Sequence, residues 1–366
     1  AGGRRARRSG AARRWVRPRL VVEARFAGWT SDGQLRHAVF VGLRPDKAVR
    51  KVVRETAVTP TGSLPMKTSR TTPRITHPER VIDPGTGLTK LDLVHYYESV
   101  ADRLLVHLKG RPCSMVRAPD GVAGERFFQK HMPPRQIEGV RQLDPALWPG
   151  HEPLLEVPSV EAILAAAQMN VIEFHTWNST VRHIDAPDRI VFDLDPGEGV
   201  AWPRVREAAA LLRSFLEDLG LRCWLKTSGG KGLHVVVPIA RRHDADTVKA
   251  LSRSVVRHVA RVVPDRFVAT SGPSNRVGRI FVDYLRNGHG ATTVAAFSAR
   301  ARPGLGVSMP IDWDALDDVD GGAHWTIATA RDHLSFRRED PWRAFARSRQ
   351  SLATAMKRLP PDPSTP

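Results

Sequence analysis

Alternating apolar and polar positions in RIVFDLDPGEG, residues 189–199, are typical of a β-strand whose two faces differ. Ile190 and Leu194 fall on an apolar face, which we expect to pack in a core, whereas Asp193 and Asp195 fall on the opposite face. Two neighbouring carboxylates repel each other, and burying them without a partner is unfavourable. The pattern therefore predicts a cation between them, with a divalent metal ion as the simplest candidate. An exposed strand end that opens into a Pro-Gly turn is the alternative.

The same kind of pattern predicts a compact module of strands and helices from residue 189 onward. Its elements are a strand at 189–195, a helix at about 203–219, strands at 222–226 and 233–239, a helix at about 244–263 and a strand at 279–285. This β-α-β-β-α-β order is the split βαβ module that RNA-recognition folds also contain. In such a sheet the first and fourth strands can lie side by side.

Strands and helices are also predicted on either side of this module. Helical spacing of apolar residues predicts a helix near 89–107 and another within 157–170, and strand-like stretches occur at 113–119, 126–131 and 171–179. The chain past residue 325 is predicted to be helical, with an amphipathic stretch at 341–359. The mixture of elements predicts the α+β class.

Composition divides the chain into five predicted segments. They are a basic disordered tail at 1–14, a small β-unit at 15–50, a linker at 51–72, a globular region at 73–358 and a disordered Pro-rich tail at 359–366. The small β-unit is too short to be a stable domain by itself. Its predicted hairpin turn is SDGQ, residues 31–34.

Charge narrows the range of partners. The 366 residues include 56 Lys and Arg against 38 Asp and Glu, a formal net charge of +18. This balance indicates a polyanionic partner, with nucleic acid first and an anionic membrane surface second. No apolar run reaches the ~18 residues of a membrane span, and no signal peptide is recognisable, so a cytoplasmic location is expected. The two cysteines, Cys113 and Cys223, lie far apart, which argues against a disulfide framework or a cysteine-based zinc site.

A third acid in an apolar strand is Asp283, in FVDYLRN. If the first and fourth strands of the module are neighbours, Asp283 joins Asp193 and Asp195 on one sheet surface. Three carboxylates there could hold two divalent ions, as in two-metal phosphoryl transfer. A structural ion pair between Asp283 and a nearby arginine is the alternative.

The glycine-rich stretch TSGGKGLH, residues 227–234, is a candidate phosphate cradle. Its glycines allow backbone N–H groups to converge on an anion, and Ser228 and Lys231 add side-chain donors. It is not a Walker A loop, because the GxxxxGK[ST] spacing is missing and a strand follows. A glycine-rich hairpin with a chance lysine is the alternative.

Other residues near these motifs have ordinary explanations as well. Solvated charge explains the bases around the Asp283 strand, which are Arg276, Arg279, Arg286 and Arg300. His175 in FHTWNS is more often a satisfied strand histidine than a ligand. Phe127 and Phe128 are more often core residues than base-stacking platforms.

Taken in order, the motifs FDLDPG, KTSGGKGLHVVVP and RIFVDYLRN, supported by RFFQKH and EFHTWNS, resemble the polymerase domain of bacterial DNA ligase D. That domain belongs to the archaeo-eukaryotic primase superfamily, and the resemblance covers roughly residues 73–358. Residues 15–47 resemble the end of an ATP-dependent ligase OB-fold. The resemblance implies a primase fold in which the split βαβ catalytic module packs on an N-terminal α/β unit, preceded by a short β remnant of the OB-fold.

The resemblance also implies a role for particular residues. Two divalent ions, Mn²⁺ in preference to Mg²⁺, would be bound by Asp193, Asp195 and Asp283. An incoming NTP or dNTP would be held by Arg117, Phe127, Phe128, His175, Ser228, Lys231, His234, Arg276, Arg286 and Arg300. Within that set, the two phenylalanines would stack on the templating base or its pair, and His175 would contact the sugar. A 5′-phosphate at a DNA break would be captured by Arg80 and Lys90.

The implied activity is template-dependent nucleotidyl transfer, with limited terminal transfer, that extends or fills broken DNA ends and prefers ribonucleotides. The implied setting is bacterial non-homologous end joining, at the nucleoid, with primer–template DNA, Ku, and ligase and phosphoesterase domains of the same polypeptide as partners. Some features depart from the family pattern. Arg286 stands where some relatives have a neutral Gln, and the zinc knuckle of replicative primases is absent, which argues against de novo priming. The ligase motif KxDG is missing as well, with Arg117 in place of its lysine in RAPDG, so this chain is not expected to seal nicks.

Three alternatives to a polymerase remain open. A metal-dependent nuclease or phosphoesterase could use the same carboxylates, although it would need no triphosphate pocket. A non-catalytic RNA-recognition-like module would carry aromatic residues on its central strands, where this sequence has aspartates. A basic interaction scaffold would need no metal ions.

Overall fold

The computed structural model describes residues 20–25, 28–29, 35–36, 39–43, 74–131, 137–337 and 339–360. The chain divides into two compact units, Ala1–Ser69 and Arg70–Pro366. The predicted tail at 1–14, the linker at 51–72 and the turn at 31–34 lie outside the described residues, as does most of the predicted tail at 359–366. The predicted domain boundaries therefore stay predictions.

The smaller unit contains short antiparallel strand pairs. β1 (Val22–Arg25) pairs with β4 (Val39–Leu43), and β2 (Gly28–Trp29) pairs with β3 (Leu35–Arg36). Strands of this length agree with the small β-unit predicted for this part of the chain.

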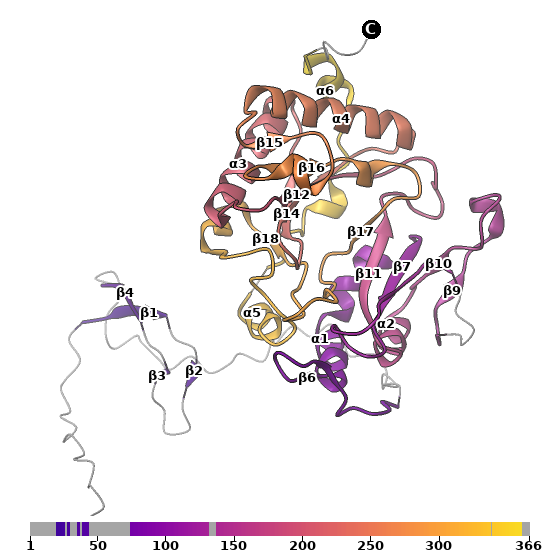
Figure 1. Ribbon diagram of the computed structural model, residues 1–366, viewed down its shortest axis with the longest axis vertical. Coiled ribbons are helices and arrows are strands. Elements are labelled where there is room, and N and C mark those ends of the chain that lie inside the picture. The colour runs from indigo at the N-terminus through magenta and orange to yellow at the C-terminus, as the bar shows by residue number, and fades with distance from the viewer. Residues whose placement is uncertain are drawn as a thin grey trace, which may run out of the picture. The chain divides into compact units, whose positions relative to one another are not determined.

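A six-stranded sheet forms the centre of the larger unit, with the order β15-β16-β12-β14-β13-β18 (Figure 1). Its strands are β12 (Arg189–Pro196), β13 (Trp224–Thr227), β14 (Leu233–Pro238), β15 (Phe267–Val268), β16 (Ile280–Asp283) and β18 (Pro310–Ile311). The predicted split βαβ module is confirmed, because β12, the first strand of the module, lies between β14 and β16. Only the short edge strands β15 and β18 add to the predicted set.

Two helices cover this sheet, α3 (Trp202–Asp218) and α4 (Ala245–Val262). Asp244 accepts a hydrogen bond from Thr247 N and begins α4, as an N-cap aspartate does. Beneath the helices, Ile190, Phe192 and Leu194 are at most 1% exposed, which confirms the apolar face predicted for β12.

A second, four-stranded sheet has the order β17-β11-β7-β8. Its strands are β7 (Cys113–Arg117), β8 (Phe127–Gln129), β11 (Val171–Trp177) and β17 (Thr292–Val294). The helices α1 (Lys90–Leu108) and α2 (Val160–Gln168) lie against each other beside it (Figure 1). Buried tyrosines of α1 join the parts of the core, since Tyr97 donates to the Ile172 carbonyl of β11 at 2.5 Å.

The remaining elements are short. They are the strands β5 (Val81–Asp83), β6 (Leu88–Thr89), β9 (Arg141–Gln142) and β10 (Leu155–Glu156), the helices α5 (Ala330–Phe336) and α6 (Ala353–Arg358), and the 3₁₀-helices η2 (Pro145–Leu147), η3 (Pro273–Arg276), η4 (Leu285–Asn287), η5 (Trp313–Asp318) and η6 (Phe345–Arg347). The whole is an α+β fold, as predicted. Within the part of the chain that the structure describes, no helix is long and apolar enough to cross a bilayer.

The prediction of a continuous amphipathic stretch at 341–359 is wrong. The segment contains only the 3₁₀-helix η6 and the short helix α6. Its polar side chains bond to the sheet instead, because Trp342 Nε1 donates to Leu225 O of β13 at 2.9 Å and Gln350 Nε2 donates to Pro238 O of β14 at 3.0 Å. These tertiary contacts with the strand region outweigh the local helical preference.

Candidate active site

The three aspartates predicted as metal ligands lie on adjacent strands. Asp193 of β12 stands directly opposite Asp283 of β16 in the antiparallel register. Directly opposed residues of antiparallel strands have Cα atoms about 4.5–5.5 Å apart and side chains on the same face. Asp195 is two residues further along β12 and therefore shares that face. The carboxylates thus lie together at one end of β12.

Each of these carboxylates has a cationic or histidine partner. Asp193 Oδ1 lies 3.3 Å from His234 Nε2, and Asp283 Oδ2 lies 3.1 Å from Arg286 Nε. Asp195 forms an ion pair with Arg276.

These pairs change how a metal ion could be accommodated. Among the described residues, no three His, Cys, Asp or Glu side chains are arranged as a ready cage for an ion. Carboxylate oxygens nevertheless have the right chemistry for Mg²⁺ or Mn²⁺. The donor set therefore fits, provided that the arginines turn away from Asp195 and Asp283. The ion pair predicted as the alternative for Asp283 is present.

Asp193 and Asp283 form a group of two facing carboxylates whose pKa values shift in opposite directions. Burial raises the pKa of Asp283, the nearby charges of Asp193 and Asp195 raise it further, and Arg286 opposes this only in part. Burial also disfavours the charged form of Asp193, but the interaction with His234 outweighs it and lowers the pKa of Asp193 to about 2. Asp283 is therefore the member of the group that most needs a further cation.

Asp283, Asp193, His234 and Lys226 form a row of facing polar side chains across the sheet. Lys226 was not predicted as a site residue. Asp193 is opposite His234 of β14, and His234 is opposite Lys226 of β13. Lys226 is 3% exposed, and its Nζ donates to His234 Nδ1 at 2.9 Å and to Ser308 Oγ at 2.7 Å. The Lys226 bond to Nδ1 leaves His234 Nε2–H to face Asp193. Burial lowers the pKa of His234 to about 4, so its imidazole is neutral near pH 7.

The predicted phosphate cradle lies beside the row, between β13 and β14. Two of its backbone amides are bonded within the loop, since Gly230 N and Gly232 N both donate to Ser228 Oγ at 3.1 Å. The Ser228 hydroxyl is buried, whereas the Lys231 side chain is exposed. The loop therefore holds its own shape and offers Lys231 as its accessible cation.

Three glycines bring this loop into direct backbone contact with its neighbours. A Cβ at Gly232 would stand 1.9 Å from Leu194 O, and one at Gly322 would stand 2.6 Å from Gly232 N. At Gly197, just past β12, a Cβ would stand 1.7 Å from Arg276 O. No other residue fits without displacing the strand end, the loop or the 320–323 segment.

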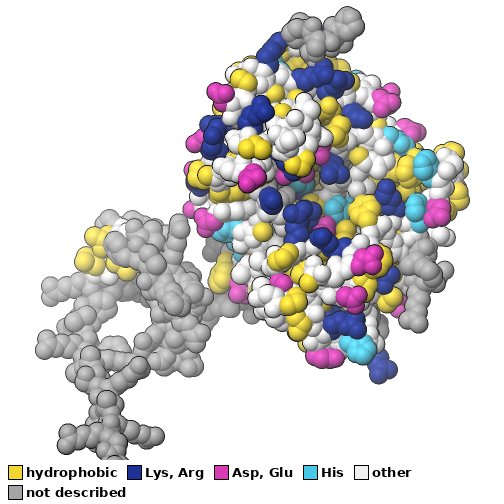
Figure 2. Space-filling model, in the orientation of Figure 1, with side chains coloured by type: hydrophobic (Ala, Val, Ile, Leu, Met, Phe, Trp, Pro, Cys, Tyr) yellow, Lys and Arg dark blue, Asp and Glu magenta, His cyan; other side chains and the backbone are white. Residues whose placement is uncertain are grey.

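An open cavity of about 1000 Å³ adjoins this junction. Lys231, Arg276 and Pro196 line it, together with the segments 197–202 and 320–324. On the face drawn in Figure 2, Lys and Arg side chains gather around the middle of the larger unit. The cavity thus has the size that a nucleotide needs, and its charged lining is mixed, with Lys231 and Arg276 beside Glu198 and Asp320.

Arg300 connects the glycine loop to the four-stranded sheet. Its Nη1 donates to Ser228 O at 2.9 Å, and its Nε donates to Glu173 Oε2 at 2.9 Å. His175 Nε2 contacts the same Glu173 oxygen at 2.6 Å. Burial disfavours the charged form of Glu173, but His175 and Arg300 lower its pKa to about 2. Glu173 was not predicted, although an acid inside the apolar strand VIEFHTW carries the same signal as Asp193 does.

Phe127 and Phe128 are each 48% exposed, so the interpretation of them as core residues is wrong. They lie on β8, at the edge of the four-stranded sheet. Phe128 contacts His175 edge-on, with ring centroids 5.7 Å apart, and Lys130 Nζ lies 5.7 Å from the Phe128 ring centre. Arg117 is opposite Phe127 in the strand register, and its Nε donates to Met169 O at 3.1 Å.

The structure brings Arg80 and Lys90 together on the segment that leads into α1. Lys90 N donates to Arg80 O at 2.8 Å, and Arg80 Nη1 donates to Pro119 O at 3.0 Å. Lys90 is only 4% exposed, and its Nζ donates to Thr76 O at 2.7 Å. Burial and the charge of Arg80 lower the pKa of Lys90.

Comparison with known proteins places this geometry in a family. The family described as "LigD, primase-polymerase domain" matches residues 89–342, and the family described as "ATP dependent DNA ligase C terminal region" matches residues 3–47. The multifunctional non-homologous end joining protein LigD of Pseudomonas aeruginosa is 47% identical over 356 residues, which is 94% of this chain and 42% of that protein. The protein of the same name from Mycolicibacterium smegmatis is 34% identical over 247 residues, 67% of this chain and 32% of its own length.

A solved structure is similar as well. The polymerase domain from Mycobacterium tuberculosis ligase D, determined in complex with DNA, matches with a TM-score of 0.66 and 29% sequence identity. The match covers 73% of this chain and 96% of that one. By contrast, this chain spans less than half of the length of the curated relatives described above.

Proposed function

This chain belongs to the LigD primase-polymerase family, and from that premise we propose that it catalyses nucleotidyl transfer to broken DNA ends in bacterial non-homologous end joining. The transfer is template-dependent, with limited terminal addition, and it prefers ribonucleotides. The observation that carries the proposal is the register of β12 and β16, which sets Asp193 opposite Asp283 beside the glycine loop.

Asp193, Asp195 and Asp283 would hold divalent ions, two of them and Mn²⁺ in preference to Mg²⁺. Such ions lower the pKa of an attacking hydroxyl and neutralise phosphate charge. Arg276 and Arg286 now neutralise two of the three carboxylates. Both arginines are partly exposed, at 24% and 50% of the side chain, so they can turn toward a triphosphate when the carboxylates take their ions.

The nucleotide would lie in the cavity beside the glycine loop. Lys231 supplies an exposed cation for the phosphates, and Arg276 lines the same cavity. Ser228 shapes the loop by accepting two of its amides, and Arg300 joins the loop to Glu173 and His175. His234, held by Lys226, orients Asp193.

The base and the sugar would meet the four-stranded sheet. Phe127 and Phe128 offer exposed aromatic surface for stacking, which is worth about 1–3 kcal/mol per base. His175 touches Phe128 and would contact the ribose 2′-hydroxyl, which supports the preference for ribonucleotides. Arg117 lies beside Phe127 at the nucleotide site.

Arg80 and Lys90 would capture the 5′-phosphate on the far side of a gap. Lys90 is buried and must exchange its bond to the Thr76 carbonyl for the phosphate, whereas the Arg80 side chain is exposed. Ku, together with ligase and phosphoesterase domains of the same polypeptide, would complete the end-joining assembly in the cytoplasm, at the nucleoid.

Primer extension on a gapped duplex with a recessed 5′-phosphate tests the proposal. We expect one or a few nucleotides to be added with Mn²⁺, faster from NTPs than from dNTPs, and none in EDTA. Asp193→Asn should abolish addition while DNA binding persists, whereas Asp246→Asn, at an exposed position in the first turn of α4, should extend normally. Normal extension by Asp193→Asn would overturn the assignment of the carboxylates. Primers that become shorter instead would favour the nuclease alternative.

A further inference from the structure

Another cavity, with an excess of positive charge, lies at the opposite end of β12. It has a volume of about 580 Å³ and is lined by the start of β12, the end of α1, the loop at 180–188, residues 238–242 and the C-terminal segment 340–349. From Arg189 to Asp195 the strand advances about 20 Å, at roughly 3.3 Å per residue. The cavity is therefore separate from the proposed nucleotide site.

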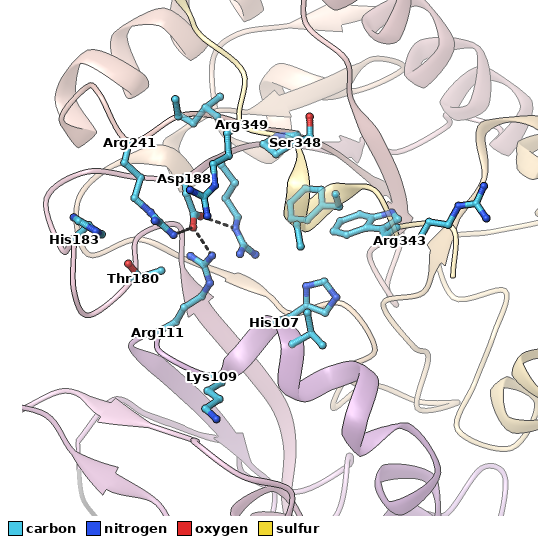
Figure 3. A pocket seen from close by; sticks show the side chains of 18 of the residues that line it. His107, Lys109, Arg111, Thr180, His183, Asp188, Arg241, Arg343, Ser348 and Arg349 are labelled. Atoms are coloured by element: carbon cyan, nitrogen blue, oxygen red, sulfur yellow. Dashed lines mark hydrogen bonds and ion pairs between the residues drawn. The ribbon is translucent and has the colours of Figure 1, made fainter. Parts of the chain in front are cut away.

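Three arginines meet one carboxylate inside this cavity (Figure 3). Asp188 Oδ2 accepts from Arg111 Nη2 at 2.7 Å and from Arg241 Nη2 at 2.9 Å, and its Oδ1 lies 3.3 Å from Arg189 Nε. Arg111 and Arg189 are only 7% and 9% exposed. One negative charge cannot balance three positive ones, and buried charges are normally balanced.

Residues around the rim of the cavity add to the excess of positive charge. In all, seven Lys and Arg residues line the cavity against two Asp residues. Arg349 is exposed at the rim, on the C-terminal segment that covers part of the opening.

Two buried polar atoms at the cavity also lack a partner within the described chain. They are Arg241 Nε, on a side chain that already bonds Asp188, and Thr180 Oγ1. Both residues line the cavity, and Figure 3 shows them on the same side of it as Asp188. Buried donors without an acceptor are unfavourable, so an anion with several oxygen atoms would satisfy both charge and hydrogen bonding.

Two groups that line the cavity, Arg189 and His107, have lowered pKa values. Burial, together with the charge of Arg111, lowers the pKa of Arg189 to about 10. Burial and the same arginines lower the pKa of His107 to about 3, so His107 remains neutral and adds no charge. Burial is the larger cause of both shifts, and the neighbouring arginines add to it.

We propose that this cavity binds a small polyphosphate, of the class of inorganic diphosphate and nucleoside di- or triphosphates. Guanidinium groups bind phosphate oxygens in bidentate pairs, and three of them converge here. The volume lies in the range of small-ligand sites and exceeds what a single phosphate needs. Because Arg111 and Arg189 are recessed, the ligand must enter the cavity, which a duplex backbone lying across the rim does not do.

Calorimetric titration of the full chain with inorganic diphosphate in EDTA tests the proposal. We expect Arg241→Gln to weaken binding at least tenfold and Arg349→Gln about fivefold. Arg253→Gln removes the same charge from an exposed position on α4 and should change the affinity less than twofold. Lys231→Ala, in the loop beside the other cavity, should leave this binding intact, which separates the inference from the proposed function.

Competition distinguishes the possible ligands. ATP that displaces diphosphate with equal or higher affinity would identify a nucleotide site, and ATP that fails to do so would identify a diphosphate site. Equal diphosphate binding by the wild type, Arg241→Gln and Arg349→Gln would overturn the proposal, as would an absence of diphosphate binding by the wild type. If Arg241→Gln does not fold, as judged by circular dichroism, Arg349→Gln decides the matter. Displacement by a 5′-phosphorylated oligonucleotide but not by ATP would assign the cavity to nucleic acid and also overturn it.

Discussion

The two ends of β12 present opposite arrangements of charge. At its start, Asp188 lies among three arginines, two of them buried. At its far end, Asp193 and Asp195 face Asp283, and the arginines that pair with this group are partly exposed. The first end joins distant parts of the chain through ion pairs around one carboxylate, whereas the second brings like charges together on two adjacent strands.

The two arrangements of charge should affect different properties, which are folding stability at one end of β12 and activity at the other. Breaking a buried ion pair leaves charges without compensation and is strongly destabilising. Like charges held together, by contrast, oppose folding and persist where function requires them. We therefore expect substitutions at the start of β12 to change stability, and substitutions at its far end to change activity.

The largest expected effect is that of Asp283→Asn on activity. Removing a metal ligand costs several kcal/mol of transition-state stabilisation, so nucleotide addition should fall by about 1000-fold or more. The free energy of unfolding should be unchanged or higher at pH 7, because burial and the two neighbouring acids already raise the pKa of Asp283 and the neutral amide removes their repulsion. Primer extension and urea unfolding measure the two quantities. Equal losses of activity and stability would contradict the comparison.

Asp188→Asn should have the reverse outcome. The free energy of unfolding at pH 7 should fall by about 3–5 kcal/mol, because three arginines lose their carboxylate. Folded protein should add nucleotides at a rate within twofold of the wild type. Burial opposes ionisation of Asp188, but Arg189, Arg111 and Arg241 together lower its pKa below 3.8.

The sign of this shift sets the pH dependence. A carboxylate with a lowered folded-state pKa stabilises the protein fully above its unfolded pKa, and this contribution disappears as the pH falls through the folded value. The stability difference between wild type and Asp188→Asn should therefore be constant above about pH 5 and narrow below about pH 4. Urea titrations at pH 7, 5 and 3 measure it, and a difference that stays constant down to pH 3 would refute the assignment.

Lys226→Met tests whether the row of polar side chains formed by Lys226, His234 and Asp193 supports activity. The substitution keeps the apolar stem but removes the donor to His234 Nδ1, so Asp193 loses an oriented partner. Loss of a supporting hydrogen bond around a metal ligand typically reduces activity about 10- to 100-fold. Single-turnover extension rates between pH 6 and 9 test this, with Lys357→Met on the exposed face of α6 as the control. A rate equal to that of the control would assign Lys226 to packing alone.

The smallest effect is expected for Arg286→Gln. The Arg286 side chain is 50% exposed, and surface ion pairs contribute about 0–1 kcal/mol. The free energy of unfolding should therefore change little. The extension rate should fall by less than about threefold, because Lys231 and Arg276 remain to contact the triphosphate in the proposed site. A loss of tenfold or more would show that the remaining cations do not replace Arg286 at the triphosphate.

Most of the fold could be predicted because its signals are local. Periodicity defines α1, α3 and α4. Side-chain caps at Thr89 and Asp244 begin α1 and α4, whereas α3 has a proline in its first turn and no side-chain cap. The β-α-β-β-α-β order then leaves few topologies, since sequential elements tend to lie beside one another. From that order alone, Asp283 was expected next to Asp193.

The rest of the site depends on pairs that are distant in sequence. Arg300 and Glu173 are 127 residues apart, and Asp188 meets arginines at 111, 189 and 241. No local pattern at Asp188 indicates such partners. Lys226 and Glu173 did carry a signal, which is a charged residue inside a buried strand, as at Asp193.

The glycine loop shows another limit of sequence interpretation. A glycine-rich stretch predicts free amides, but it does not reveal that Ser228 folds back to accept two of them. Likewise, the amphipathic pattern at 341–359 could not indicate that Trp342 and Gln350 bond to the sheet.

The glycines at 197, 232 and 322 have a consequence for engineering. Four stretches of main chain, at 194–197, 230–232, 276 and 322, touch there with no room for a methyl group, so mutant libraries that include these positions will mostly yield unfolded protein. Redesign of substrate choice has to work through Lys231, whose side chain is exposed on the same loop, and through the aromatic pair on β8. The backbone junction at these glycines is best left unchanged while those side chains are varied.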